Sequence, residues 1–405
     1  MASTLKLGNG NWGVKEDSLL AYSDKNNNFL PLPFDFSRAS SATVVNKAGL
    51  IETVGSGEPR IDFKDDTKGA LLLEPQSTNL VTQSELFSDA SWVKSGLTVN
   101  SNQITSPSGN LTADLLIEGN SNSGHDIRYN ANLPYNTYIY SVFVKKYNGG
   151  GDRNLRFLIG GVNTSGSFNL STGLWSAATF DNPTAIDFGN GWWKLSFSDI
   201  GVAFNVITQL TNNGNVSYQG DGVSGVYIWG AQLEQNSFST SYIQTQGSTS
   251  TRIAETCTNS GSAQDFNSEE GVLYAEISAL GEDNVYRIFG VSNGTTQNRL
   301  SLGYTNNNQL FFGADGGGNY EFEIESNAII TDNNKIALRY NSDNITLFLN
   351  GIKTIEEPNG VSFDDFTKLN FNGGNGSQPF NGNIKELQVF TKALSDEELI
   401  ELTKI

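Results

Sequence analysis

The chain has little cysteine, little histidine and little positive charge. Of its 405 residues one is cysteine (Cys257) and one is histidine (His125). A single cysteine excludes an intrachain disulfide framework, so the fold does not depend on an oxidising compartment. A single histidine excludes zinc motifs that use paired histidines, and any serine triad would have to use His125.

Basic residues number 25 against 43 acidic ones, which gives a net charge of −18. No basic stripe offsets this charge, so nucleic acid is excluded as a partner. Residues 1–11 contain no apolar signal-peptide core, and no window approaches the roughly 18 consecutive apolar residues of a membrane helix. We therefore expect a soluble protein that is made in a cytoplasm and does not insert into membranes.

Glycine and aromatic residues are abundant instead. The chain has 43 glycines, 11% aromatic residues and only 17% charged residues. Glycine and asparagine tolerate the positive φ angles of tight turns, and aromatic residues favour strands. The composition predicts an all-β protein, and the length predicts two or three domains.

Four segments follow along the chain. Residues 1–78 hold short, broken apolar clusters and predict an extended arm or small β region that packs on something else. Residues 79–247 and 266–405 predict two antiparallel β-sandwiches, and residues 248–265 a Ser/Thr/Gly-rich linker. The expected strands are 138–145, 155–159, 192–198 and 226–233 in the first sandwich, and 271–278, 286–291, 299–304, 309–312, 320–325, 335–340, 345–349, 368–371 and 384–390 in the second.

One short helix is expected at the C-terminus. Ser395 can cap it, and Glu398 completes a capping box. Leu394, Leu399 and Leu402 give it an apolar side.

The N-terminal region contains a block of motifs: 36–43 (FSRASSAT), 49–52 (GLIE), 59–63 (PRIDF) and 72–80 (LLEPQSTNL). This block, followed by Ser84 and Trp92, resembles a recurrent block of phage tail and other virion proteins. The resemblance covers about a fifth of the chain. It implies a phage virion protein that contacts other virion proteins through its N-terminal region.

Two further stretches resemble carbohydrate-binding folds. Residues 191–196 (GWWKLS), 226–235 (VYIWGAQLEQ) and 240–243 (TSYI) look like a carbohydrate-binding-module type of jelly roll. Residues 345–351 and 380–390 resemble the laminin-G and concanavalin-A-like sandwich. Together these resemblances imply a virion component with two glycan-binding-type domains.

No catalytic constellation is evident. The chain has no P-loop motif. Glu321, Glu323 and Glu325 alternate along an expected strand and would share one face, as paired acids do in some glycosidases. Alternation arises in any half-buried strand, so we interpret them as a solvated face and expect no enzyme.

A bound metal is the other chemical option. A structural calcium ion in the first sandwich would have Glu234 and Asp221 as candidate ligands, because calcium prefers hard oxygen donors.

Exposed aromatic rings would carry glycan recognition, since their faces stack on sugar rings. The glycan-binding candidates are Trp92, Tyr129, Tyr135, Trp175 and Tyr218, all in or near expected loops. Trp192 and Trp193 point to opposite sides of a strand, so one of them belongs to the core. Trp229 lies in an apolar strand and is also expected in the core.

The sequence therefore predicts a homo-oligomeric phage virion protein that binds host-surface glycans. Many copies on a particle would raise avidity without new contacts. Two alternatives remain: a purely architectural decoration or adaptor protein, and a glycan depolymerase that uses acids of the second sandwich.

Overall fold

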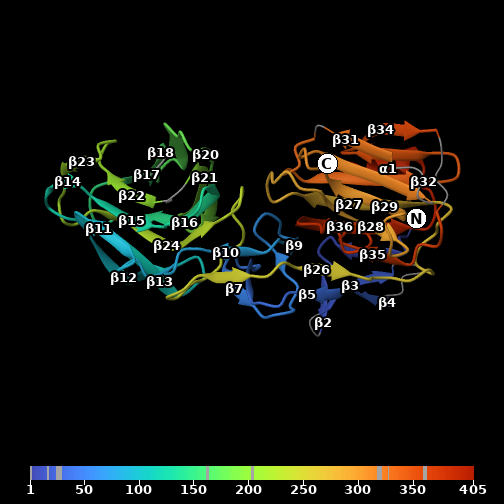
Figure 1. Cartoon of the computed structure of the whole chain (residues 1–405), viewed down its shortest axis with the longest axis horizontal. Helices are drawn as coiled ribbons and strands as arrows, with labels where there is room; N and C mark the ends of the chain where they lie inside the picture. Colours follow the sequence, from blue (N-terminus) through green and yellow to red (C-terminus); the bar gives the residue numbers. More distant parts are fainter. Residues whose placement is uncertain are drawn as a thin grey trace. The chain divides into compact units, whose positions relative to one another are not determined.

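A computed structural model describes residues 2–15, 18–23, 30–160, 164–201, 205–316, 322–326, 328–358 and 363–405. These residues form a nearly all-β protein with several antiparallel sheets and one short C-terminal helix, as the composition predicts (Figure 1). The chain divides into two compact units. Unit 1 holds residues 1–47, 54–75 and 253–405, and unit 2 holds residues 48–53 and 76–252.

Unit 2 is a sandwich of two six-stranded sheets whose inward side chains form one hydrophobic core. The first sheet contains, in spatial order, β11 (Trp92–Ser95), β15 (Asp126–Asn130), β22 (Asn205–Thr211), β17 (Asn154–Gly160), β18 (Thr164–Asn169) and β19 (Leu174–Ser176). The second contains β12 (Leu97–Thr105), β13 (Leu111–Glu118), β24 (Gly225–Glu234), β16 (Asn136–Lys146), β21 (Trp192–Gly201) and β20 (Asp181–Gly189). Two small pairs complete the unit: β14 (Asn122–Gly124) with β23 (Ser217–Gln219), and β10 (Ser77–Asn79) with β25 (Ser250–Arg252).

Unit 1 is a second sandwich. Its larger sheet has eleven strands: β1 (Leu5–Gly8), β2 (Gly13–Lys15), β3 (Ser18–Ser23), β4 (Leu30–Pro33), β8 (Ile61–Asp62), β9 (Ala70–Leu73), β27 (Gly271–Ser278), β32 (Asn334–Tyr340), β33 (Ile345–Leu349), β34 (Ile352–Glu357) and β36 (Gly382–Phe390). The smaller sheet has five: β31 (Phe322–Ser326), β30 (Leu310–Gly316), β29 (Asn298–Tyr304), β28 (Arg287–Ser292) and β35 (Lys368–Asn370). β5 (Asp35–Ser37) pairs with β26 (Thr256–Thr258), and β6 (Ala42–Val45) pairs with β7 (Ile51–Val54).

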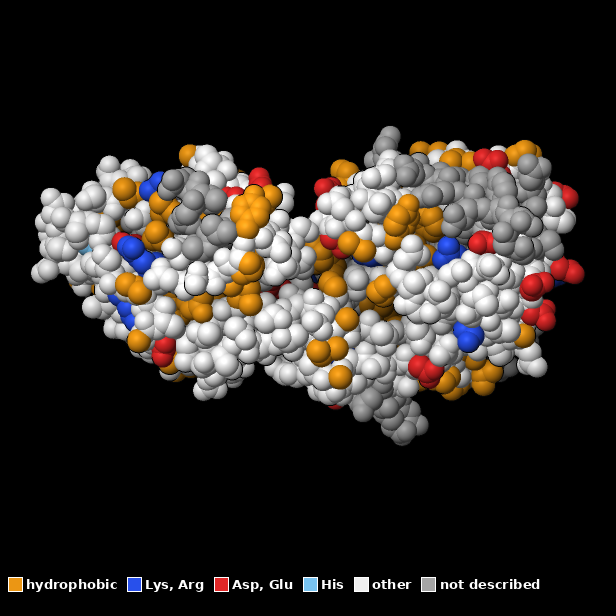
Figure 2. Space-filling model, in the orientation of Figure 1, with side chains coloured by type: hydrophobic (Ala, Val, Ile, Leu, Met, Phe, Trp, Pro, Cys, Tyr) orange, Lys and Arg blue, Asp and Glu red, His pale blue; other side chains and the backbone are white. Residues whose placement is uncertain are grey.

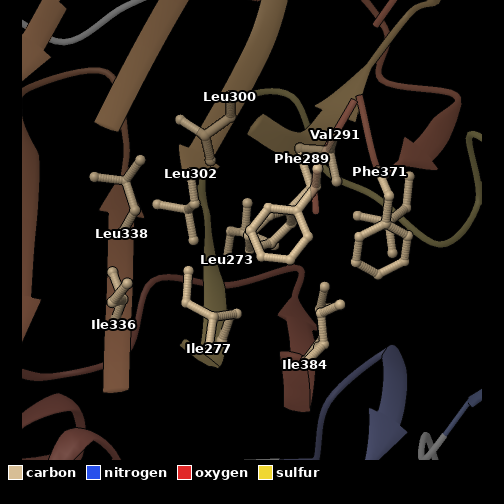
Figure 3. Packing of buried hydrophobic residues seen from close by; sticks show 14 of the residues in the cluster. Leu273, Ile277, Phe289, Val291, Leu300, Leu302, Ile336, Leu338, Phe371 and Ile384 are labelled. Atoms are coloured by element: carbon tan, nitrogen blue, oxygen red, sulfur yellow. The ribbon is translucent and has the colours of Figure 1, made fainter. Parts of the chain in front are cut away.

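The core of unit 1 lies between these two sheets. Figure 3 shows aliphatic side chains of β27, β32 and β36 meeting Phe289 and Val291 of β28 and Leu300 and Leu302 of β29. Successive side chains of a strand point to opposite faces, so every second residue of these strands enters the core. The burial of this apolar surface is the main driving force for the fold of the unit.

The N-terminal strands are part of this second sandwich. β1 pairs with β36 in the register Leu5↔Val389, and β9 pairs with β36 in the register Ile384↔Leu71. Leu5 and Leu71 are fully buried in the same core. The region predicted as an arm therefore completes the sheet of residues 266–405.

The segment predicted as a linker, 248–265, contains two short strands. β25 pairs with β10 in unit 2, and β26 pairs with β5 in unit 1. Its Ser/Thr/Gly composition suggested a free connection, but its two strands pair with β10 and β5, and Ser260 exchanges backbone hydrogen bonds with Leu369.

The C-terminal helix α1 (Asp396–Thr403) has the predicted start. The Ser395 side chain accepts a hydrogen bond from the N–H of Glu398, and the Glu398 carboxylate accepts one from the N–H of Ser395. Leu394 and Leu399 pack against the outer face of the large sheet. Among the described residues no helix is long and apolar enough to cross a membrane.

One buried carboxyl makes the stability of unit 2 depend on pH. Burial raises the pKa of Asp114 to about 6, although its oxygens accept hydrogen bonds from the N–H groups of Asn102 and Phe87. Because the folded pKa lies above the unfolded value, the stabilisation is complete at low pH and is lost as pH rises through about 6.

We therefore expect the free energy of unfolding of the wild type, relative to Asp114→Asn, to fall between pH 4.5 and 7.5. Urea unfolding followed by tryptophan fluorescence measures it, because five of the six tryptophans belong to unit 2. A difference that stays constant or grows with pH contradicts this assignment.

Candidate functional site

Three of the five aromatic candidates do not offer a ring to a ligand. Trp92 is 1% exposed, and Tyr129 and Tyr218 are also buried. The Trp92 ring packs on those of Phe87 and Tyr129, and its Nε1–H donates to the backbone oxygen of Gln83. The expectation that these three rings are exposed in loops is wrong, because they lie on strands and face inward.

The other two candidates differ from each other. Tyr135 lies between β15 and β16 and is 72% exposed, so it remains a glycan-binding candidate. Trp175 is half-buried on β19, where its ring contacts Phe157 and Phe168 of the core.

The core predictions for the remaining tryptophans are confirmed in unit 2. Trp229 is 1% exposed, and its Nε1–H donates to Thr112 Oγ1. Trp192 is buried, while Trp193 is half-buried against the core on the opposite side of β21.

The first sheet of unit 2 leaves one face open to solvent. Along β17 the buried residues Leu155, Phe157 and Ile159 alternate with the half-buried residues Arg156 and Leu158. β22 and β18 show the same alternation. We call ten outward side chains near the middle of this sheet the open face. They are Val93, Asp126, Arg128, Arg156, Leu158, Ser165, Ser167, Ser176, Ile207 and Gln209, of which Asp126 is buried at 5% exposure.

The open face consists of two parallel rows set by the strand register. One row is polar across five strands, in the order Asp126, Gln209, Arg156, Ser167, Ser176. The neighbouring row is mixed, in the order Val93, Arg128, Ile207, Leu158, Ser165. Adjacent strands lie about 4.8 Å apart, so the polar row extends over roughly 20 Å.

Hydrogen bonds hold the planar groups of the open face in place. Arg156 Nη1 donates to Gln209 Oε1 at 3.3 Å, and Arg156 Nη2 donates to Ser165 Oγ at 3.3 Å. Arg128 Nη2 donates to Asp126 Oδ1 at 2.8 Å and forms a salt bridge with it. Where β15, β17 and β22 lie in Figure 1, Figure 2 shows basic and apolar side chains next to one another.

Such a surface has the chemistry to bind a sugar chain. Apolar Leu158 and Ile207 can cover the C–H side of a sugar ring, while guanidinium, amide and hydroxyl groups pair with its hydroxyls. A few fixed polar groups within an apolar surround are the usual arrangement of a ligand site. These residues were not among the predicted glycan-binding candidates, which were loop aromatics, although the polar/apolar alternation of β17 and β22 is visible in the sequence.

Neither residue predicted for calcium has free carboxylate oxygens. Glu234 is fully buried and accepts hydrogen bonds from Ser77 Oγ, Thr240 N and Thr240 Oγ1. Asp221 accepts from the N–H groups of Val223 and Ser224, which together with Arg153 lowers its pKa. N–H and O–H donors occupy positions that a cation would need, so neither residue fits a calcium site as it stands. Within the described ranges no three His, Cys, Asp or Glu residues cluster so as to hold a metal.

A buried ionic cluster occupies one end of unit 2. Glu118 accepts hydrogen bonds from Arg153 Nε and Nη2, both at 2.6 Å, from Tyr218 Oη at 2.6 Å and from Asp221 N at 2.9 Å. His125 lies beside it, with Nδ1 2.5 Å from the backbone oxygen of Gly96. Tyr218 and His125 therefore have a structural role, which is to hold the segment 217–224 in place.

The acidic strand of the second sandwich is only partly described. Glu323 and Glu325 belong to β31 and lie beside Gly313 and Phe311 of β30. Glu321 lies outside the described residues. The prediction that the three glutamates share one face of the strand therefore stays untested.

A second buried network was not predicted. Glu255 contacts Arg38 Nη1 at 2.8 Å and Arg60 Nη2 at 2.6 Å, and Arg60 Nη1 contacts Glu74 Oε2 at 2.7 Å. Arg38, Arg60 and Glu74 each belong to a different motif of the N-terminal block. In the sequence, the position of these residues beside apolar strands was the only indication of the network. Their partner Glu255 lies in the segment that was predicted as a linker.

The fold defines an all-β protein built from two sandwiches. Residues 274–400 match the family described as the concanavalin A-like lectin/glucanases superfamily, which agrees with the predicted resemblance of the second sandwich. No curated protein matches the chain.

Solved structures with a similar fold include carbohydrate-binding modules. The CBM40 of the Ruminococcus gnavus IT-sialidase bound to α2,3-sialyllactose is 20% identical, covers 36% of this chain and 93% of its own, and has a TM-score of 0.31. Domain 4 of an extracellular GH43 arabinanase from Geobacillus stearothermophilus, in complex with arabinotriose, is 14% identical, covers 41% of this chain and 82% of its own, and has a TM-score of 0.29. At these scores the similarity carries no argument about a ligand of this chain.

Proposed function

We propose that this chain is a non-catalytic glycan-binding protein and that the open face of unit 2 is its binding surface. The observation that carries the proposal is the pairing of a polar row with a mixed apolar row across five strands, with Arg156 and Gln209 already oriented by a hydrogen bond. Pre-oriented groups lose less conformational entropy when a ligand binds. The match of residues 274–400 of unit 1 to a lectin and glucanase superfamily supports glycan binding by the chain, not the choice of this face.

The experiment is a glycan array with the full chain presented as a multivalent display. Presentation in many copies is needed because shallow single sites bind weakly and gain apparent affinity from avidity. We expect reproducible binding to a defined group of oligosaccharides. No binding by correctly folded protein contradicts the proposal.

A matched pair of variants tests the surface. Leu158→Glu places a charge in the middle of the open face, whereas Leu111→Glu places the same charge on β13, where Leu111 is 61% exposed. We expect Leu158→Glu to weaken glycan binding tenfold or more and Leu111→Glu to leave it unchanged, with both melting temperatures checked. Equal binding by the two variants locates the site elsewhere.

The proposal that this chain is a component of a phage virion rests on the resemblance of its N-terminal region alone. That resemblance implies a phage virion, contacts with other virion proteins and repeated copies that meet host glycans together. The buried network of Arg38, Arg60 and Glu74 gives the charged residues of the block a structural role within this chain. A pull-down of virion proteins with the intact chain as bait would test the virion proposal separately from glycan binding.

A further inference from the structure

Arg156 stands out on the open face because its charge has no carboxylate partner. Its guanidinium donates to the neutral groups Gln209 Oε1 and Ser165 Oγ, and no ion pair links it to an acid in the described part of the chain. Arg128 in the neighbouring row is paired with Asp126 at 2.8 Å. The open face therefore presents one uncompensated positive charge near the middle of its polar row.

This charge is local, in a chain whose net charge is −18. At physiological salt, charges separated by more than about 8 Å are largely screened. A carboxylate next to Arg156 is therefore attracted mainly by that guanidinium and not repelled by distant acids. Arginine also matches a carboxylate in geometry, since its planar fork can donate two parallel hydrogen bonds.

The shape of the face selects the form of the ligand. The polar row crosses five strands in one line, and hydroxyl or amide groups flank Arg156 on both sides, namely Gln209 and Ser167. A linear chain of sugars can follow such a row, whereas a single terminal sugar would use only one part of it. Leu158 in the adjacent row can cover a ring face beside the charge.

We infer that the open face binds linear oligosaccharides containing hexuronic acid and that Arg156 pairs with the uronate carboxylate. This inference rests on the proposed function and names its ligand class.

The test is calorimetric titration of the full chain with hexuronate tetrasaccharides, each beside its carboxyl-reduced neutral counterpart. A charge-assisted hydrogen bond contributes enough for an effect on the order of tenfold in Kd. We expect at least one uronate to bind about tenfold more tightly than its neutral counterpart. Arg156→Gln should remove that preference, and Lys146→Gln, on β16 outside the open face, should leave it unchanged.

The outcomes separate this inference from the proposed function. Equal binding of charged and neutral members, both lost in Leu158→Glu, would overturn the uronate inference and leave glycan binding in place. A preference for sialyllactose that depends on Arg156 would overturn the linear-uronate ligand. Absence of binding to every glycan would contradict the proposed function itself.

Discussion

Replacing Glu255 by glutamine lowers the free energy of unfolding of unit 1 by about 3–5 kcal/mol, the usual cost of removing one partner from a buried ion pair. The Glu255 carboxylate is fully buried and accepts hydrogen bonds from Arg38, Arg60 and the N–H of Glu74. The glutamine amide would turn an N–H₂ group toward these donors. It would also leave the network with two buried arginines and one acid.

The single cysteine provides the measurement. Cys257 is buried in unit 1, where burial raises the pKa of its thiol, so it reacts only when the unit opens. Labelling of the thiol across a urea gradient reports the unfolding of this unit. Asp65→Asn is the control, since it removes the exposed Lys64–Asp65 pair and should change stability by less than about 1 kcal/mol. Equal stability of Glu255→Gln and Asp65→Asn would show that the network does not hold unit 1 together.

The second large effect is expected at Glu118 in unit 2. Glu118→Gln should lower the free energy of unfolding of this unit by about 3–5 kcal/mol because Arg153 loses its buried partner. The Arg153 side chain is 6% exposed and that of Glu118 is fully buried. The Tyr218 hydroxyl and the Asp221 N–H also lose an acceptor, so the 217–224 loop should become accessible to proteases first.

Tryptophan fluorescence during urea unfolding measures this effect. The control is Asp152→Asn, which removes an exposed pair with Lys146 at 2.8 Å. Limited proteolysis adds a local readout, with cleavage expected between residues 217 and 224 in Glu118→Gln only. A variant that unfolds at the wild-type urea concentration and resists cleavage would be incompatible with a structural role for the cluster.

The fold class was predictable because local patterns decide it. Strands such as 138–145 and 226–233 are rich in aromatic and β-branched residues, and the helix start at Ser395 carries its own capping signal. The association of the N-terminal strands with β36 was not predictable, because it depends on pairing between residues more than 300 positions apart, such as Leu5 and Val389.

The site was harder to predict than the fold. Trp92 and Tyr218 were interpreted as ligand-facing because aromatic residues serve both cores and binding surfaces, and only the burial of each ring separates the two uses. The open face depends on which side of each strand points outward and on how six strands are ordered. Arg156 and Gln209 are neighbours only because β17 pairs with β22.

The most direct measurement is a crystal structure of the full chain with the tightest oligosaccharide found on the glycan array. We predict that the sugar chain lies along the polar row of the open face, in contact with Arg156 and Gln209, and covers Leu158. A sugar bound on any other surface of the chain would contradict it.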